Sequence, residues 1–437
     1  MNKQLHLISL GCTKNLVDSE VMLGRLRDYA ITDDAAQADV IIINTCGFID
    51  AAKEESINTI LQVHETRKDD SILVVSGCLS ERYREELAAE LPEVDIFTGV
   101  GDYERIDALI AKRQSTFSPE VYLATDTAPR VITGSNYHAY IKIAEGCNQQ
   151  CSFCAIPSFK GKLHSRTIDS IVREVTALVN QGFYDFSFIS QDSSSFGRDM
   201  GLKEGLIELI DAVEAIKGVK SARILYLYPS TTSLALIDRI ADSPVFQTYY
   251  DMPIQHIDDR VLKTMRRGFG EAKTIELLKR MKSKPDAFVR TSVIAGHPGE
   301  DEAAFDKLCR FLETFGFDRI NVFSYSNEEG THAYTMAQLP SEVIAQRTER
   351  LGEIAVQAKV ASLEKMVGRR CTLALDGTSD EHDYLLSARP LLWAPEIDGE
   401  VLVNDTSDLP VTVGARYEAR ITERIGEQLL ATLENPA

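Results

Sequence analysis

The sequence predicts an α/β protein in three parts: a doubly wound parallel sheet, a partial (β/α)6 TIM-like barrel and a small β-barrel. Three observations support this prediction. Apolar and amphipathic runs alternate over residues 4–113, six further strand candidates begin at residue 139, and short alternating runs begin at residue 368. Strands that alternate with helices predict parallel sheets, and short alternating strands predict a β-barrel. We therefore expect domains at residues 1–120, 134–365 and 367–437.

In the first part, each apolar strand candidate is followed by a run with helical periodicity. The expected strands are 5–10, 40–44, 72–75 and 95–100, and the expected helices are 19–29, 51–66, 80–90 and 103–112. This alternation predicts a sheet with helices on both faces. Residues 114–136 are polar and rich in Thr, Ser and Pro, which indicates a linker.

The second part repeats the alternation and then changes into a β pattern. Its expected strands are 139–143, 185–189, 222–226, 248–252, 287–294 and 319–323. Its expected helices are 169–180, 233–241, 272–281, 303–314 and a long one at 341–366. In such barrels the chemistry lies at the carboxyl ends of the strands. The runs 371–375, 399–403 and 415–421 predict a small barrel of the oligonucleotide/oligosaccharide-binding style.

Composition limits the class of protein. The chain has 437 residues, of which 44% are hydrophobic and 26% charged, as in ordinary globular proteins. No run of 18 apolar residues occurs and the first ten residues are too polar for a signal peptide, so we expect a cytoplasmic protein without a membrane segment. Eight cysteines in such a chain favour metal ligation over disulfides. The net charge of −19 favours a basic partner.

Three cysteines lie within eight residues, at Cys147, Cys151 and Cys154. This C-x3-C-x2-C spacing suits three irons of a [4Fe–4S] cluster and leaves the fourth iron open to a small molecule. It is typical of the radical S-adenosylmethionine (SAM) superfamily, in which the open iron binds SAM and one electron cleaves it to a radical. The alternative is zinc, but structural zinc takes four ligands, and only His164 lies close by.

Cys12, Cys46 and Cys78 are far apart in sequence, yet each follows a predicted strand. In a doubly wound sheet, ligands bind beyond the carboxyl ends of the strands. Three thiols delivered there predict a second metal centre, again with an open position. The alternative is three buried core cysteines, since free cysteine is often buried. Cys309 and Cys371 lie in apolar helix and strand patterns, and we expect them only to pack.

Taken together, these segments resemble the methylthiotransferase family of radical SAM enzymes over nearly the whole chain. The segment SLGCTKNLVDSE at residues 9–20 and the segment at residues 147–162 look like the RimO branch, and residues 394–399 look like the small barrel called TRAM. The resemblance implies that the first domain holds an auxiliary [4Fe–4S] cluster on Cys12, Cys46 and Cys78. The second domain would be the radical SAM core, with its cluster on the other triad, and the third would be the TRAM barrel.

The resemblance also implies a reaction, the addition of a methylthio group to the β-carbon of an aspartate in the small-subunit ribosomal protein number twelve. One SAM would donate a methyl group to sulfur, and a second would give the radical that removes hydrogen from the unactivated carbon. The reaction then needs an electron donor and a sulfur source. Holding the target near both clusters is largely a positional problem.

Other residues at strand ends are candidates for the SAM pocket. Gln191 and Asp192 end the second barrel strand, and Gly296 and Glu300 follow the fifth. A polar loop cap explains the first pair equally well, and a turn before a helix explains the second. His256 follows the fourth strand and faces either the substrate or an ordinary loop partner. The single tryptophan, at position 393, either lies on the barrel surface for recognition or fills its interior.

The leading interpretation is therefore an enzyme that acts on a protein. The alternatives are the same chemistry on a tRNA adenosine next to the anticodon, as in the MiaB branch, and an iron–sulfur electron carrier or scaffold. Residues 367–437 contain thirteen acidic residues and six arginines. This excess of negative charge disfavours binding to phosphates and favours a basic protein as the partner. We expect acids such as Asp380, Glu381 and Asp383 to dock it, unless they form only a solvated turn.

Overall fold

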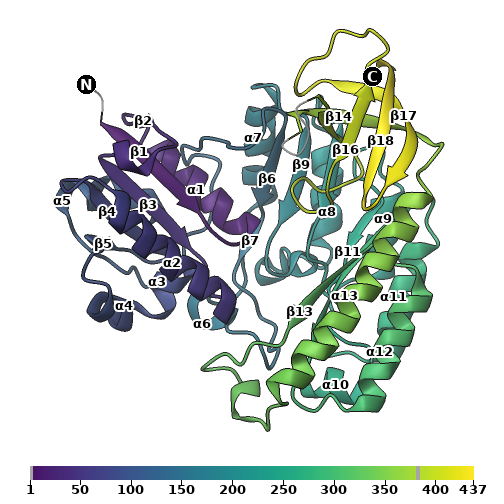
Figure 1. Ribbon diagram of the computed structural model, residues 1–437, viewed down its shortest axis with the longest axis horizontal. Helices are drawn as coiled ribbons and strands as arrows, with labels where there is room; N and C mark the ends of the chain where they lie inside the picture. The colour runs from purple at the N-terminus through teal and green to yellow at the C-terminus, as the bar shows by residue number, and fades with distance from the viewer. Residues whose placement is uncertain (1–2, 380–383) are drawn as a thin grey trace.

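The structure is a computed structural model that describes residues 3–379 and 384–437. A helix-covered sheet, an open barrel of strands and helices, and a small closed barrel follow one another along the chain (Figure 1). The predicted docking acids Asp380, Glu381 and Asp383 lie outside the described residues. No helix of the described chain is long and apolar enough to cross a membrane.

The N-terminal sheet is parallel, with strand order β2-β1-β3-β4-β5. Its strands are β1 Gln4–Ser9, β2 Ala30–Ile31, β3 Val40–Thr45, β4 Ile72–Gly77 and β5 Ile96–Phe97. Its helices are α1 Thr13–Arg25, α2 Asp50–Thr66, α3 Cys78–Arg82, α4 Arg84–Glu90 and α5 Ile106–Lys112, with 3-10 turns η1 Ala35–Gln37 and η2 Tyr103–Arg105. Val40 and Ile42 pack in the core beside α1 and α5, whereas Ile41 and Ile43 pack beside α2. Helices therefore cover both faces, and the doubly wound prediction is confirmed.

Two helices of this part differ from the prediction. Helix α1 begins at Thr13, directly after Cys12, earlier than the amphipathic pattern indicated. The apolar pattern missed this start because the first turns contain the polar Asn15 and Asp18 on a buried face. These residues are 1% and 0% exposed and bond to neighbouring elements. The predicted helix at 80–90 is two helices, because Tyr83 leaves helical backbone geometry at φ −125° and ψ 39°.

Six parallel strands form the central barrel, as predicted. They are β6 His138–Lys142, β9 Asp185–Ile189, β10 Ser221–Ile224, β11 Tyr249–Asp251, β12 Phe288–Ala295 and β13 Arg319–Ser324. They form the sheets β10-β9-β6 and β11-β12-β13, which a parallel bridge from Ala222 to Phe246 connects. The outer helices are α7 Ile168–Val179, α8 Gly205–Glu214, α9 Leu234–Ala241, α11 Glu271–Lys282, α12 Glu302–Phe315 and α13 Ser341–Glu364. Smaller elements are the hairpin β7 Ala144–Glu145 with β8 His164–Ser165, the helices α6 Ile156–Lys160 and α10 Asp259–Thr264, and the turns η3 Ser193–Ser195, η4 Arg198–Met200 and η5 Ala333–Thr335.

The C-terminal strands close into a barrel in the order β14-β15-β16-β18-β17. They are β14 Arg370–Thr378, β15 Leu386–Pro390, β16 Val401–Asp405, β17 Arg416–Ile425 and β18 Gln428–Pro436. Helix α13 runs up to this barrel (Figure 1). Trp393 is 1% exposed and its ring lies 6.4 Å from that of Phe288, so it fills the contact with the central barrel and is not on the surface.

Buried ion pairs join the three parts. Arg389 of β15 bonds to Asp185 of β9 at 3.0 Å, and Arg223 of β10 holds the other oxygen of the same carboxylate at 2.7 Å. At the other end of β6, Lys142 pairs with Asp18 of α1, and both side chains are fully buried. A buried charge that loses its partner is costly, so these pairs fix how the outer parts sit on the central barrel.

Candidate active site

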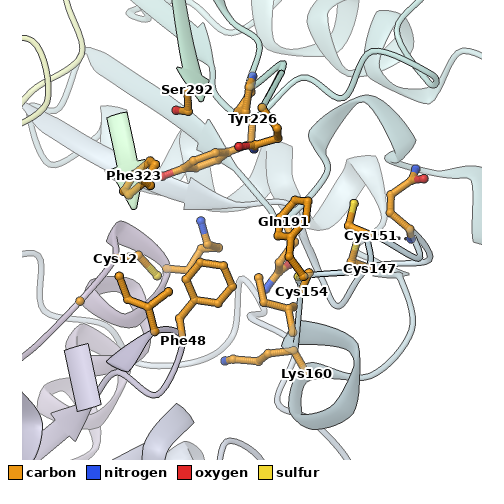
Figure 2. A pocket seen from close by; sticks show the side chains of 18 of the residues that line it. Cys12, Phe48, Cys147, Cys151, Cys154, Lys160, Gln191, Tyr226, Ser292 and Phe323 are labelled. Carbon is orange, nitrogen blue, oxygen red and sulfur yellow. Dashed lines mark hydrogen bonds between the residues drawn. The ribbon is translucent and has the colours of Figure 1, made fainter. Parts of the chain in front are cut away.

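One cavity of about 540 Å³ lies between the N-terminal sheet and the central barrel. Its wall includes the six predicted ligand cysteines: Cys12, Cys46, Cys78, Cys147, Cys151 and Cys154. In Figure 2, Cys12 and Phe48 lie on one side of the cavity, and Cys147 and Cys151 lie on the other. Two triads that come from different parts of the chain therefore share one space.

The N-terminal triad is assembled by the sheet. Cys46 directly follows β3 and Cys78 directly follows β4, as predicted, while Cys12 precedes α1. Asn15 ties these loops together, since its amide donates to the carbonyls of Leu10 and Thr45, each at 3.1 Å. The Cys78 thiol donates to the Asn15 oxygen at 3.7 Å.

Gly11 explains how closely two of these loops approach. Its φ of +85° lies in the left-handed region, and a Cβ at this position would lie 2.6 Å from the Cβ of Cys46 and 2.9 Å from its Sγ. Only glycine, which lacks a Cβ, tolerates both the backbone angle and the contact.

The second triad lies in the loop after β7, and donors of the barrel point at its sulfurs. Arg267 Nη1 donates to the Sγ of Cys151 at 3.2 Å. The Tyr228 hydroxyl lies 3.4 Å from the same sulfur and donates to the carbonyl of Arg267 at 3.0 Å. The backbone N–H of Gln149 donates to the Sγ of Cys147 at 3.4 Å. Such donors stabilise a thiolate and tune a cluster that it ligates.

The thiols fit iron–sulfur ligation. Burial raises the pKa of Cys46 to about 11 and that of Cys78, Cys147 and Cys154 to about 12. Because iron binds the thiolate, ligation replaces a proton that burial otherwise keeps on the sulfur. In residues 3–379 and 384–437, no three of His, Cys, Asp and Glu gather closely enough for a single metal ion. In a [4Fe–4S] cluster each cysteine thiolate binds a different iron, so the three sulfurs of a triad do not need to meet at one point.

A buried charge network lies beside both triads. The Lys142 ammonium pairs with Asp18 and, at 2.6 Å, with Glu145. Lys160, on the cavity wall, is 3.6 Å from both carboxylates. Burial raises the pKa of Glu145, but Lys142 and Lys160 more than offset this effect and lower it to about 2. Glu145 therefore stays ionised and also accepts a hydrogen bond from Gln191.

The predicted SAM-pocket residues lie at two depths. Gln191 lines the cavity, whereas Asp192 lies behind it and accepts a hydrogen bond from Gln149 at 2.8 Å. Gly296 and Glu300 do not line the cavity among the described residues. Glu300 accepts hydrogen bonds from the Gly296 N–H at 3.0 Å and from Arg347 of α13 at 2.7 Å.

His256 also lies away from the cavity wall, because its ring nitrogen is 3.2 Å from Glu300 in a fully buried pair. Its Nδ1 accepts a hydrogen bond from the N–H of Asp258 in the same loop at 3.0 Å, so the second of its two predicted settings, an ordinary loop partner, is the observed one.

Several residues of the wall were not predicted from the sequence. Tyr226 and Gln255 follow β10 and β11, and both have left-handed backbones, with φ of +65° and +68°. Such angles are strained for residues other than glycine and gather at functional sites. Their position at the carboxyl ends of barrel strands was the available signal. Phe48 and Phe323, 36% and 46% exposed, also line the cavity and come from opposite parts of the chain.

Comparison with known families agrees with the three-part architecture. Residues 4–99 match the uncharacterized protein family UPF0004, residues 141–312 match the radical SAM superfamily, and residues 367–433 match the TRAM domain. Among solved structures, a radical S-adenosylmethionine methyltransferase, TsrM from Kitasatospora setae, matches with a TM-score of 0.53 and 13% identity over 74% of this chain and 73% of that chain. At this identity the match supports the fold alone.

Curated relatives are much more similar. A ribosomal protein uS12 methylthiotransferase RimO from Sulfurovum sp. (strain NBC37-1) is 74% identical over 99% of this chain and 98% of that protein. Proteins of the same name from Aliarcobacter butzleri and Sulfurimonas denitrificans are 62% and 60% identical, over 99% and 100% of this chain. The chain therefore belongs to the ribosomal protein uS12 methylthiotransferase RimO family of radical SAM enzymes.

Proposed function

We propose that this enzyme transfers a methylthio group to the β-carbon of an aspartate in ribosomal protein uS12. The names of the relatives support the substrate, and all three bear the name of a uS12 enzyme and not of a tRNA enzyme. The single observation that carries the proposal is that both cysteine triads line one cavity. A transfer between a sulfur source and a radical centre requires the target carbon to reach both sites.

In this proposal, Cys12, Cys46 and Cys78 hold an auxiliary [4Fe–4S] cluster and the other triad holds the cluster that binds SAM. When bound, the two clusters and SAM supply the sulfur, the methyl group and the radical that removes a hydrogen atom from the target carbon. The domains that carry these parts are residues 1–120, 134–365 and 367–437. Gln191 is the predicted SAM-pocket residue with the strongest support, since it lines the cavity.

The chain's own residues hold this arrangement in place. Arg267 donates to the sulfur of Cys151 and orients it, and Tyr228 holds Arg267 by donating to its carbonyl at 3.0 Å. Lys142 clamps Asp18 of the N-terminal part to Glu145 beside the second triad, which fixes the distance between the two triads. Apolar side chains such as Phe153 and Phe159 line the cavity and exclude water, which protects a radical from side reactions.

The enzyme also needs partners. We propose that the acidic C-terminal barrel docks the basic ribosomal protein, free or within the ribosomal subunit, since opposite charge speeds encounter and fixes orientation. An electron donor and a sulfur source complete the reaction, and a cytoplasmic setting would bring all of them together. Binding of uS12 should weaken as salt rises.

The decisive experiment is mass spectrometry of ribosomal proteins and tRNA from cells with and without this gene. We expect a methylthio group on uS12 only when the gene is present, with no change in tRNA. A methylthio group that appears on tRNA and not on uS12 would make tRNA the substrate, as in the MiaB branch. Purified enzyme that does not cleave SAM would instead favour an electron carrier.

A further inference from the structure

Among the described residues, four cationic side chains line the cavity. Two of them lie beside carboxylates, and a third, Arg267, uses its N–H groups on other atoms of the protein. Lys160 lies beside Asp18 and Glu145. Arg290 pairs with Asp251 at 3.0 Å. Arg267 donates to the carbonyl of Pro253 at 2.7 Å and to the sulfur of Cys151. These three charges are committed to the protein itself.

Lys14 is the fourth cation, and its setting differs. It is the second residue of α1, two positions after Cys12, and its half-buried side chain lines the cavity. Among the described residues, no carboxylate lies within ion-pair distance of its ammonium. The ammonium contacts the face of Tyr226, whose ring centroid is 3.7 Å from Nζ. A half-buried ammonium without a carboxylate is poised for an anion that comes from outside.

Tyr226 holds this ammonium in place. Its ring projects into the cavity, as Figure 2 shows. Its left-handed φ of +65° is fixed by a hydrogen bond from its own N–H to Asp251 at 3.0 Å. A cation held over an aromatic face keeps its N–H groups free to donate elsewhere. Tyr226 therefore holds the Lys14 ammonium at the wall of the cavity.

We propose that Lys14 binds the side-chain carboxylate of the target aspartate and is the residue that selects an acidic side chain. This inference rests on the proposed function, because it assumes that the substrate is an aspartate of uS12. The β-carbon of aspartate is bonded directly to the carboxyl carbon. Holding the carboxylate at Lys14 thus holds the reacting carbon within one bond, beside the triad that contains Cys12. Lys14 is a specificity-determining residue, and the chemistry remains with the cofactors.

The test compares binding of two forms of uS12 to the anaerobically reconstituted full-length enzyme. One form carries the target aspartate and the other carries asparagine at that position. We expect the wild-type enzyme to bind the aspartate form about tenfold to a hundredfold more tightly, as for a hydrogen bond between charged groups. Lys14→Met should bind both forms equally, with the affinity that the wild type shows for asparagine. A preference that persists unchanged in Lys14→Met would overturn the inference.

Two further variants control this test. Lys112→Met removes the same charge from the exposed end of α5 and should keep the full preference. Tyr226→Leu leaves Lys14 intact but removes the ring beneath it, and should reduce the preference about threefold or more. If Lys14→Met does not hold iron, Tyr226→Leu carries the test, and an unchanged preference there would overturn the inference.

Failure of the inference and failure of the proposed function give different results. If the wild-type enzyme neither binds nor modifies uS12, the proposed function is wrong and the assignment of Lys14 falls with it. If the wild-type enzyme modifies uS12 while Lys14→Met still prefers aspartate, the function stands and only the role of Lys14 is wrong. Iron content and SAM cleavage, measured on each variant, report whether its cofactor sites are intact.

Discussion

The two cysteine triads face one cavity but are built in opposite ways. Cys147, Cys151 and Cys154 lie in one short loop, so their proximity follows from the covalent chain. The N-terminal triad comes from three strand ends and depends on the alignment of β1, β3 and β4. In that alignment Asn44 of β3 pairs with Ser9 of β1 and with Ser76 of β4. One triad is therefore a property of local sequence, and the other is a property of the sheet.

The largest effect should come from removing the local triad. Replacing Cys147, Cys151 and Cys154 with Ala should reduce the iron content of reconstituted enzyme from about eight to about four and abolish SAM cleavage. Iron assay and chromatography of 5′-deoxyadenosine would measure both. Cys309→Ala and Cys371→Ala are the matched controls, and both should keep full iron. SAM cleavage that survives in the triple variant would contradict the assignment.

Removing the sheet-dependent triad should separate the two activities. Replacing Cys12, Cys46 and Cys78 with Ala should also lower iron to about four. Reductive SAM cleavage should survive, because its ligands lie in another part of the chain, while methylthio transfer to uS12 is lost. Mass spectrometry of uS12 checks the transfer. Transfer that persists would refute a role for this triad in sulfur insertion.

Breaking the clamp between the triads should destabilise the protein. Lys142→Met leaves Asp18 and Glu145 buried without their closest cation, which should cost about 3–5 kcal/mol. Thermal unfolding followed by circular dichroism would show a lower midpoint. Lys112→Met, at an exposed lysine, should leave the midpoint nearly unchanged. Equal midpoints for the two variants would show that the network does not hold the parts together.

A smaller change should disturb the sheet-dependent triad alone. Gly11→Ala adds a Cβ that would meet Cys46 at 2.6 Å and strains the left-handed backbone, at a cost of about 1–3 kcal/mol. We expect lower iron occupancy of that triad with SAM cleavage retained. Gly182→Ala has similar backbone strain, with φ of +101°, but no atom within 4 Å, so it should keep its iron. Full iron in Gly11→Ala would show that the loops can move apart.

The smallest effect should come from a single hydroxyl beside the local triad. Tyr228→Phe removes the hydroxyl that lies 3.4 Å from the sulfur of Cys151 and holds Arg267 by donating to its carbonyl at 3.0 Å. The hydrogen bond from Arg267 to that sulfur favours the more negative reduced state of a ligated cluster. Loosening Arg267 should therefore lower the reduction potential by on the order of tens of millivolts. Electron paramagnetic resonance during redox titration measures it. A potential that rises or stays constant would rule out this contribution.

A buried apolar face recurs about every 3.6 residues in a helix and about every two residues in a strand. Hydrophobic periodicity therefore predicted the alternation of strands and helices and the three-part order. It misplaced the start of α1 because Asn15 and Asp18 are buried polar residues that pair across elements, which a pattern of apolar residues cannot register. It also did not predict β15 and β18. Both strands depend on closure of the C-terminal barrel, which pairs β18 in parallel with β16 and antiparallel with β17.

The sequence by itself determined the two triads as candidate ligand sets, since one has a diagnostic spacing and the other recurs after strands. Only the tertiary structure decided that both line one cavity, together with Lys14 and Tyr226. It also distinguished Gln191, which lines the cavity, from Glu300, which among the described residues does not. The physical reason is that spacing along a chain fixes distances only within a loop. Distances between strand ends of different domains depend on packing and on buried pairs such as that of Lys142.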